Sequence, residues 1–129
     1  MKTHILITGA SRGIGAAIAA SFDPATTKWV ALSSQDGDLH DPAVPAQLWA
    51  KALESLDGRI DVLINNAGIF EPNPVARPDD AWLDSWNRTM QINLTASADL
   101  CRRAVLHWQE NGASGRIVNI ASRAAHRGD

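Results

Sequence analysis

The stretch Thr8-Gly9-Ala10-Ser11-Arg12-Gly13-Ile14-Gly15 decides the fold of this chain, because it joins an apolar run to a helix-forming run. Residues 4–7 (His-Ile-Leu-Ile) predict a buried strand before it, and residues 16–20 (Ala-Ala-Ile-Ala-Ala) predict a helix after it. Glycines in such a turn let a pyrophosphate approach the free N–H groups of the helix N-terminus. The spacing therefore predicts a phosphate cradle, and a glycine-rich loop that merely turns the chain is the alternative.

A second apolar run ends in a motif of its own. Residues 61–64 (Asp-Val-Leu-Ile) lead directly into Asn65-Asn66-Ala67-Gly68. Together, T-G-x-x-x-G-x-G and N-N-A-G in this order resemble the short-chain dehydrogenase/reductase family, and the resemblance runs from about Met1 to the last residue. It implies an oxidoreductase that transfers a hydride reversibly between a nicotinamide cofactor and a carbonyl or alcohol substrate.

Composition and charge narrow the class of protein. A length of 129 residues predicts one domain, and a net charge of −2 gives no case for binding nucleic acid or an anionic membrane surface. There is no apolar run of transmembrane length, and the N-terminus leads straight into a strand rather than a signal peptide. With a single cysteine, Cys101, a cytoplasmic location is expected. No metal site is predicted, because the histidines are scattered: His4, His40, His107 and His126.

Alternating strands and helices predict an α/β fold with a doubly wound, Rossmann-like parallel sheet. Strands are expected over about 3–8, 28–33, 61–65 and 115–122. Helices are expected over about 13–22, from Asp41-Pro42 to about Leu56, and from Asp79 through Asn93 to about Glu110. The proline-rich segment 69–78 predicts an extended loop. We expect residues 1–129 to form a single NAD(P)-binding domain that is incomplete at its C-terminus.

The segment after the second strand departs from the family. A turn at Ser34-Gln35-Asp36-Gly37 is followed at once by Asp38-Leu39-His40-Asp41, which matches the segment after the family's third strand. Because there is no room for the intervening helix, the third strand is predicted to be abbreviated or missing. The sheet is expected to stop after the fifth strand, at residues 115–122, which then forms an open edge.

The long helix carries two apolar stripes. The first is predicted to face the sheet: Leu94, Ala98, Cys101, Val105 and Trp108. The second is predicted to point away from it: Leu100, Ala104 and His107. An exposed apolar stripe is typical of an interface, and the family's equivalent helix packs against its symmetry mate, so a homodimer or homotetramer is expected. The alternative is that a later part of the same chain covers the stripe.

The resemblance assigns cofactor roles residue by residue. The phosphates and the adenosine end are expected at Gly9, Ser11, Arg12, Gly13, Ile14 and Gly15. Asp38 and Leu39 match the adenine contacts, and Ala67 and Gly68 match the backbone that approaches the ribose. Asn65 is expected to tie its strand to the neighbouring strands. For Asp38, a capping or solvated carboxylate is an equally weighted alternative.

The expected cofactor is NADP(H), with NAD(H) possible. NAD-preferring proteins place an acid at the end of the second strand, where it binds the ribose 2′-OH and repels a 2′-phosphate. Ser33 stands at that position here, and Arg12 can reach a 2′-phosphate through charge-assisted hydrogen bonds. Asp36 argues against a preference for NADP(H), because the shortened segment can bring its carboxylate toward the ribose.

Ser122 and Asn93 match the family's catalytic serine and asparagine. The serine hydroxyl hydrogen-bonds the substrate oxygen, and the asparagine marks a helix kink whose carbonyl holds a water for proton relay. The alternatives are a loop serine and a solvated asparagine. The family's proton donor is a tyrosine in Y-x-x-x-K, but this sequence has no tyrosine and ends before that motif. The 129 residues alone are therefore expected to be inactive, with His126 the only candidate substitute. A non-catalytic nucleotide-binding or scaffold protein is the alternative function.

Overall fold

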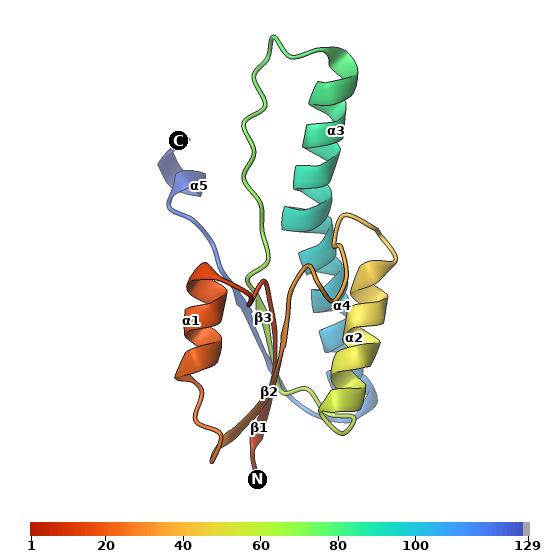
Figure 1. The fold of residues 1–129 in the computed structure, drawn as a ribbon. Coiled ribbons are helices and arrows are strands. Elements are labelled where there is room, and N and C mark those ends of the chain that lie inside the picture. Colours follow the sequence, from red (N-terminus) through yellow and green to blue (C-terminus); the bar gives the residue numbers. More distant parts are fainter. Residues whose placement is uncertain (128–129) are drawn as a thin grey trace.

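The computed structural model describes residues 1–127, which form a four-stranded sheet with helices on both faces (Figure 1). The elements are β1 (Thr3–Thr8), α1 (Gly13–Ser21), β2 (Thr27–Leu32), α2 (Val44–Ser55), β3 (Val62–Asn65), α3 (Asp79–Met90), the π-helical segment η1 (Gln91–Thr95), α4 (Ala96–Glu110), β4 (Arg116–Asn119) and α5 (Ala124–Arg127). All strand pairs are parallel, in the order β2-β1-β3-β4. The predicted α/β parallel fold is confirmed.

The central strand β1 has a neighbour on each side. Leu6 pairs with Val30 of β2 on one side and with Leu63 of β3 on the other. The chain therefore first winds outward through α1 to β2 and then crosses back over β1 to β3 and β4. Figure 1 shows α1 on one face of the sheet and α2 and α4 on the other. This reversal makes a switch point between β1 and β3, and ligands of such sheets bind outside the carboxyl ends of the strands there.

Alternate residues of β1 pack into two cores, as the two-residue period of a strand requires. Leu6 packs with Leu63, Leu48 and Leu100 between the sheet and helices α2 and α4. Ile5 and Ile7 pack with Ile64 on the opposite face, against Ile18 of α1 and Phe22, which directly follows this helix. Two clusters of buried side chains thus sandwich the sheet and hold its carboxyl edge in place.

The short segment between β2 and α2 holds turns and no strand, so of the two predicted outcomes, an abbreviated or a missing strand, the structure has the second. The predicted helix start at Asp41-Pro42 is wrong, because α2 begins at Val44 with Pro45 in its first turn. Asp41 instead closes the preceding turn: its carboxylate accepts the Ala43 N–H at 2.9 Å, and its carbonyl accepts the Val44 N–H at 3.0 Å. Pro42 and Pro45 both fit the first turn of a helix, and in the structure it is Pro45 that lies there.

The predicted faces of the long helix are wrong in part, because only Trp108 and Cys101 of the stripe expected to face the sheet pack in the core. The buried side chains of α4 are Ala96, Leu100, Ala104 and Trp108. Leu100 and Ala104, which the sequence assigns to an exposed stripe, are at most 1% exposed, whereas Leu94 and Val105 are 56% and 42% exposed. The helix is apolar over an arc wider than one packing face, so periodicity alone does not decide which half contacts the sheet.

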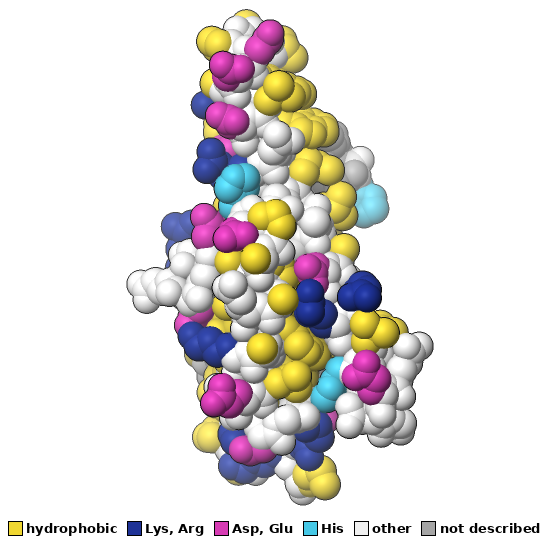
Figure 2. Space-filling view, turned by 90° about the vertical axis from the view of Figure 1, so that its right-hand side faces the viewer, with side chains coloured by type: hydrophobic (Ala, Val, Ile, Leu, Met, Phe, Trp, Pro, Cys, Tyr) yellow, Lys and Arg dark blue, Asp and Glu magenta, His cyan; other side chains and the backbone are white. Residues whose placement is uncertain are grey.

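The upper part of the molecule has apolar side chains on its surface. Figure 1 shows α3 rising beyond the sheet beside the segment 66–78. Figure 2, which faces the α2, α3 and α4 side, shows exposed hydrophobic side chains along this region. They include Leu83 and Trp86, both about half exposed, and Trp86 stacks on Trp82 with ring centroids 5.3 Å apart. None of the described helices has the length and apolar character needed to span a bilayer.

Candidate nucleotide-binding site

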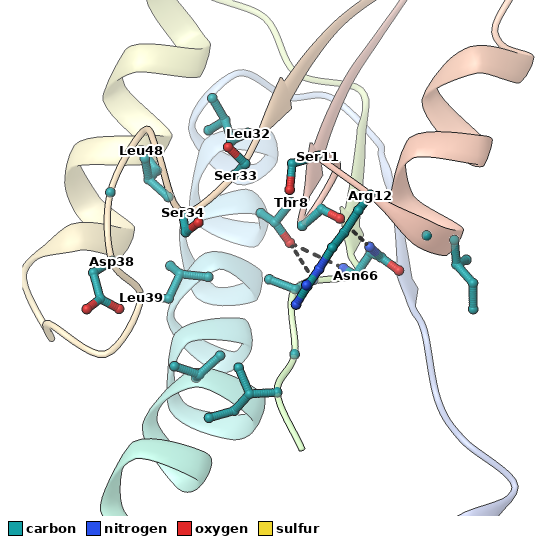
Figure 3. Close-up of a pocket in the computed structure, with 18 residues that line it drawn as sticks. Thr8, Ser11, Arg12, Leu32, Ser33, Ser34, Asp38, Leu39, Leu48 and Asn66 are labelled. Atoms are coloured by element: carbon teal, nitrogen blue, oxygen red, sulfur yellow. Dashed lines mark hydrogen bonds between the residues drawn. The ribbon is translucent and has the colours of Figure 1, made fainter. Parts of the chain in front are cut away.

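A cavity of about 420 Å³ opens at the carboxyl ends of β1, β2 and β3, beside the switch point of the sheet (Figure 3). Its walls come from the turns after the three strands and from η1. The lining residues are Thr8, Gly9, Ser11, Arg12, Gly13, Ile14, Leu32, Ser33, Ser34, Gly37, Asp38, Leu39, Leu48, Asn66, Ala67, Gly68, Ile69 and Ile92. Every site residue predicted from the sequence lines this cavity except Gly15, Asn65, Asn93 and Ser122.

Two glycines of the first motif have no room for a side chain. A Cβ atom on Gly9 would lie 2.7 Å from the Ala67 Cα atom, and the φ angle of Gly9 is +64°. A Cβ atom on Gly15 would overlap the Gly9 carbonyl oxygen and the Asn66 Nδ2 atom. The loop after β1, the start of α1 and the loop after β3 are therefore packed backbone against backbone. This close packing explains the glycine spacing, although Gly15 itself does not line the cavity.

Thr8 and Asn66 fasten the two motifs together. The Thr8 Oγ1 atom accepts the backbone N–H groups of Asn66 at 3.2 Å and Ala67 at 3.1 Å. The Asn66 Nδ2 atom donates to the Gly9 carbonyl at 2.9 Å (Figure 3). Sequence reasoning missed both residues as part of the site. Their signal is a polar residue directly after a buried apolar strand, and Thr8 is only 2% exposed.

The N-terminus of α1 offers a site for an anion. Arg12 is the N-cap residue, and the first turn of α1 has no acidic side chain. Figure 3 shows the Arg12 side chain extending over the cavity. Among residues 1–127, no carboxylate forms an ion pair with the Arg12 guanidinium. Free helix N–H groups, the helix dipole and this cation together favour a phosphate group at this wall.

The opposite wall is apolar and ends at Asp38. Leu39, Leu48 and Ile92 line it, so a flat apolar group fits between the segment after β2 and η1. The Gln91 Nε2 atom, on η1, donates to the Leu39 carbonyl at 3.3 Å and ties the two segments together. Asp38 lines the cavity, and its Oδ1 atom also accepts the His40 N–H at 2.9 Å. Asp38 therefore closes a local turn with its carboxylate and is also part of the cavity wall.

Ser33 and Ser34, directly after β2, line the cavity, and the Ser33 Oγ atom also accepts the Gln35 N–H at 3.3 Å. Asp36 is not among the lining residues. Its Oδ2 atom accepts the Ser33 N–H at 2.9 Å, and its Oδ1 atom accepts from the Lys51 ammonium group at 2.7 Å. The hydrogen bond from Lys51, followed by that from the Ser33 backbone, holds the pKa of Asp36 below its ordinary value of 3.8. This carboxylate is therefore ionised at neutral pH.

Asn93 lies in the π-helical segment between α3 and α4, and its amide contacts the loop after β3. The Asn93 Oδ1 atom accepts the Ile69 N–H at 2.8 Å, and the Nδ2 atom donates to the Ile69 carbonyl at 2.8 Å. A π-helical turn interrupts the regular helix at this point, where the resemblance implies a kink. The side chain is thus used in structure rather than left solvated, although Asn93 itself does not line the cavity.

Two further predicted residues lie outside the cavity. Ser122 is exposed in the segment after β4, and its Oγ atom accepts the Ala124 N–H at 3.1 Å, at the start of α5. Asn65 is buried, and its Nδ2 atom donates to the Asn119 Oδ1 atom of β4 at 2.9 Å. Asn65 therefore ties two neighbouring strands together, which agrees with the structural role expected from the sequence.

The extended loop after β3 is held to α3 by Glu71. The buried Ser85 hydroxyl donates to the Glu71 Oε1 atom at 2.7 Å, and the Arg88 Nε atom lies 3.4 Å from the same oxygen. The hydrogen bond from Ser85, with a smaller contribution from Arg88, lowers the pKa of Glu71 from its ordinary value of 4.5. Phe70 and Val75 on this loop are almost fully exposed. One side of the loop is thus anchored to α3, while these two apolar side chains reach the solvent.

Comparison with known families and structures gives a consistent result. A model of the family described as short chain dehydrogenase matches residues 31–129. A D-threitol dehydrogenase from Mycolicibacterium smegmatis is 33% identical over an alignment that covers 93% of this chain and 52% of that protein. The chain spans about half the length of the curated relatives it matches.

Solved structures share the fold. A 4-hydroxyisoleucine dehydrogenase in complex with NADH is 30% identical with a TM-score of 0.80, and the match covers 97% of this chain and 58% of that one. The protein ElxO with NADP bound is 24% identical with a TM-score of 0.77, and the match covers 100% of this chain and 59% of that one. One of these similar proteins therefore holds NADH and the other NADP.

Proposed function

This chain belongs to the short-chain dehydrogenase/reductase family, and we propose that it binds NADP(H) for hydride transfer to or from a carbonyl or alcohol substrate. The observation that carries the proposal is the glycine-rich wall of the cavity at the N-terminus of α1, which Gly9, Arg12 and Gly13 line. Such a turn fits a pyrophosphate, because glycine lets the backbone and the free N–H groups of the helix approach it closely. When bound, the nicotinamide supplies or accepts the hydride.

The proposed roles follow the walls of the cavity. Arg12 and the N–H groups at the start of α1 hold phosphate groups, and Leu39 and Ile92 enclose the adenine with Asp38 at its edge. Ala67 and Gly68 present backbone to the ribose near the nicotinamide. The preference for NADP(H) over NAD(H) is supported by the hydroxyl groups of Ser33 and Ser34 at the end of β2.

Titration of the chain with both cofactors tests this preference. The chain has five tryptophans, so fluorescence quenching or calorimetry gives the dissociation constants of NADPH and NADH. We expect NADPH to bind more tightly, because Arg12 gains a charge-assisted contact with the 2′-phosphate. Tighter binding of NADH would contradict the preference, and binding of neither would contradict the cofactor site itself.

We propose that the 129 residues bind cofactor but do not turn over substrate. Ser122 is proposed to hydrogen-bond the substrate oxygen and Asn93 to hold a water, but none of the residues is a tyrosine. Loss of general acid–base catalysis alone costs on the order of 10²–10⁴-fold in rate. The assay follows NADPH absorbance with a panel of ketones and aldehydes, and with purified chain of verified mass. Sustained turnover that His126→Ala abolishes would contradict this proposal.

Assembly and location are proposed as for the family: a homodimer or homotetramer in the cytoplasm that acts on a small molecule, without nucleic acid or membrane partners. The support for assembly is the exposed apolar stripe of Leu94, Ala98 and Val105 on the long helix, rather than the stripe expected from the sequence. Light scattering at micromolar concentration tests it. A protein that is only monomeric would contradict the proposed assembly.

A further inference from the structure

The turn after β2 is closed by one carboxylate. Asp36 and Ser33 exchange two hydrogen bonds: the Asp36 N–H donates to the Ser33 carbonyl at 3.0 Å, and the Ser33 N–H donates to the Asp36 Oδ2 atom at 2.9 Å. The second carboxylate oxygen is bound by Lys51 of α2 at 2.7 Å. The segment that replaces the missing strand and helix is therefore anchored to α2 through an ion pair.

This turn forms part of the cavity wall, but the ion pair does not. Ser33, Ser34 and Gly37 line the cavity, whereas Asp36 and Lys51 do not. Gly37 also packs against α2, where a Cβ atom would lie 2.7 Å from the Val44 Cγ1 atom. The turn is thus packed against α2, and the Asp36–Lys51 ion pair that joins them lies outside the cavity lining.

The charge of Asp36 matters because the carboxylate is bound to the backbone N–H of Ser33, the first residue after β2. A free carboxylate there binds a ribose 2′-OH and repels a 2′-phosphate. Asp36 is the acid closest to this position in the sequence, and its side chain is only 26% exposed, between the Ser33 backbone and Lys51. Lys51 thus neutralises the Asp36 carboxylate, which as a free charge in this turn would work against NADP(H).

We propose that Lys51 is a specificity-determining positioning residue, which holds the Asp36 carboxylate outside the cavity so that the turn after β2 admits a 2′-phosphate. This inference rests on the proposed cofactor function. Lys51 acts through Asp36 rather than by touching the cofactor. Loss of Lys51 leaves an uncompensated negative charge beside the 2′-position. This charge weakens the binding of a ligand with a 2′-phosphate more than the binding of a ligand with a 2′-hydroxyl.

Two ligands that differ only in the 2′-phosphate test the proposal: adenosine 2′,5′-bisphosphate and 5′-AMP. Calorimetry on the full chain gives the affinity ratio of the two ligands, in wild type and in Lys51→Met. We expect Lys51→Met to lower the ratio by about threefold or more, the size of the effect of an exposed ion pair. Lys51→Arg, which keeps the charge, should leave the ratio near the wild-type value.

The chain offers a matched control at the other end of β2. Lys28 and Asp57 form an exposed ion pair of the same length, 2.7 Å, away from the cavity. Lys28→Met should therefore leave the affinity ratio unchanged. In an Asp36→Asn background, which removes the charge, Lys51→Met should no longer lower the ratio. Because Asp36→Asn alone should keep or raise the ratio, the test also holds if Lys51→Met fails to fold.

The outcomes separate the two proposals. If wild type binds neither adenosine ligand nor either dinucleotide, the proposed function and this inference both fail. If wild type binds but Lys51→Met leaves the ratio unchanged, or weakens both ligands equally, only this inference fails. If Lys51→Met lowers the affinity ratio in the Asp36→Asn background as much as it does in wild type, Lys51 contacts the phosphate directly, which also overturns the inference.

Discussion

The Asn93 side chain and the Ile69 backbone are joined by two reciprocal hydrogen bonds of 2.8 Å, in which the amide both accepts and donates. The asparagine thereby pairs with the loop after β3 as a neighbouring strand would. Its helical turn, η1, also carries Ile92 in the cavity wall and Gln91, which binds the Leu39 carbonyl. One irregular turn of helix therefore holds both the loop after β3 and the segment after β2, on opposite sides of the cavity.

Asn93→Ala should destabilise the chain by about 1–2 kcal/mol, because two hydrogen bonds of about 1 kcal/mol each are lost. Asn93→Asp keeps the contact with the Ile69 N–H but places a carboxylate against the Ile69 carbonyl, so it should not restore stability. Urea unfolding gives both values. Asn87→Ala, on the exposed surface of α3, is the control and should stay within about 0.5 kcal/mol of wild type. Equal effects at positions 87 and 93 would contradict the prediction.

Gly15→Ala should disturb the cavity wall, although Gly15 itself does not line the cavity. The added Cβ atom meets the Gly9 carbonyl and the Asn66 amide, which are themselves bonded, so α1 or the loop after β3 has to shift. We expect a loss of stability of about 1–3 kcal/mol, typical of overpacking, together with nucleotide affinity that falls about tenfold or more. Unfolding and titration with NADPH measure the two effects. An unchanged affinity would argue against the cradle, and Ala17→Ser on the exposed side of α1 is the control.

Much of the site follows from local sequence signals. The stretch 8–15 and the motif 65–68 each follow a buried apolar run, and each has a pattern of glycine and asparagine that is specific to few kinds of site. The strands before them end at the same edge of the sheet because the sheet is parallel. The missing strand follows from chain length alone, because residues 33–43 are too few for a helix and a strand. These features predict the fold and most of the cavity lining without any contact information.

Other features depend on contacts between distant segments. The sheet-facing side of α4 is decided by packing against β3 and α2, so a wide apolar arc leaves it undetermined. Trp108 and Cys101 pack in the core as predicted, but Leu100 and Ala104 are buried beside them while Leu94 and Val105 are exposed. The Thr8 hydroxyl accepts the Asn66 N–H, 58 positions away in the sequence, and the Asn66 amide donates to the Gly9 carbonyl. The position of the Asp36 carboxylate depends on Lys51, a residue of the next helix. No local pattern predicts these pairings.

Gly115→Ala should destabilise the core at the other end of the sheet. Trp108 is 8% exposed, and its Nε1 atom donates to the Ile60 carbonyl at 2.8 Å. A Cβ atom on Gly115 would overlap this indole ring, so either β4 moves or the hydrogen bond is lost. The expected cost is about 1–3 kcal/mol in the free energy of unfolding. In a Trp108→Phe background the same change should cost less, and a cost that stays equal would exclude this contact as the cause.

The Asp36–Lys51 ion pair should make stability depend on pH in the acid range. The pKa of Asp36 is lowered in the folded chain, first by the hydrogen bond from Lys51 and then by the Ser33 N–H. A lowered folded-state pKa stabilises the folded chain above the unfolded-state value, and this contribution is lost as the pH falls through the folded-state pKa. Wild type should thus exceed Asp36→Asn in stability by a constant amount above about pH 5, and the difference should shrink below the ordinary value of 3.8.

Chemical unfolding of both proteins from pH 7 to pH 3 measures this difference. Because Lys51 is 53% exposed, we expect it to stay under about 1 kcal/mol and to fall further in 1 M salt. Asp84→Asn is the control: this exposed residue of α3 forms no ion pair among residues 1–127, so its curve should follow wild type. A difference that grows as the pH falls would reverse the sign and show that the Asp36 carboxylate is not stabilised in the folded chain.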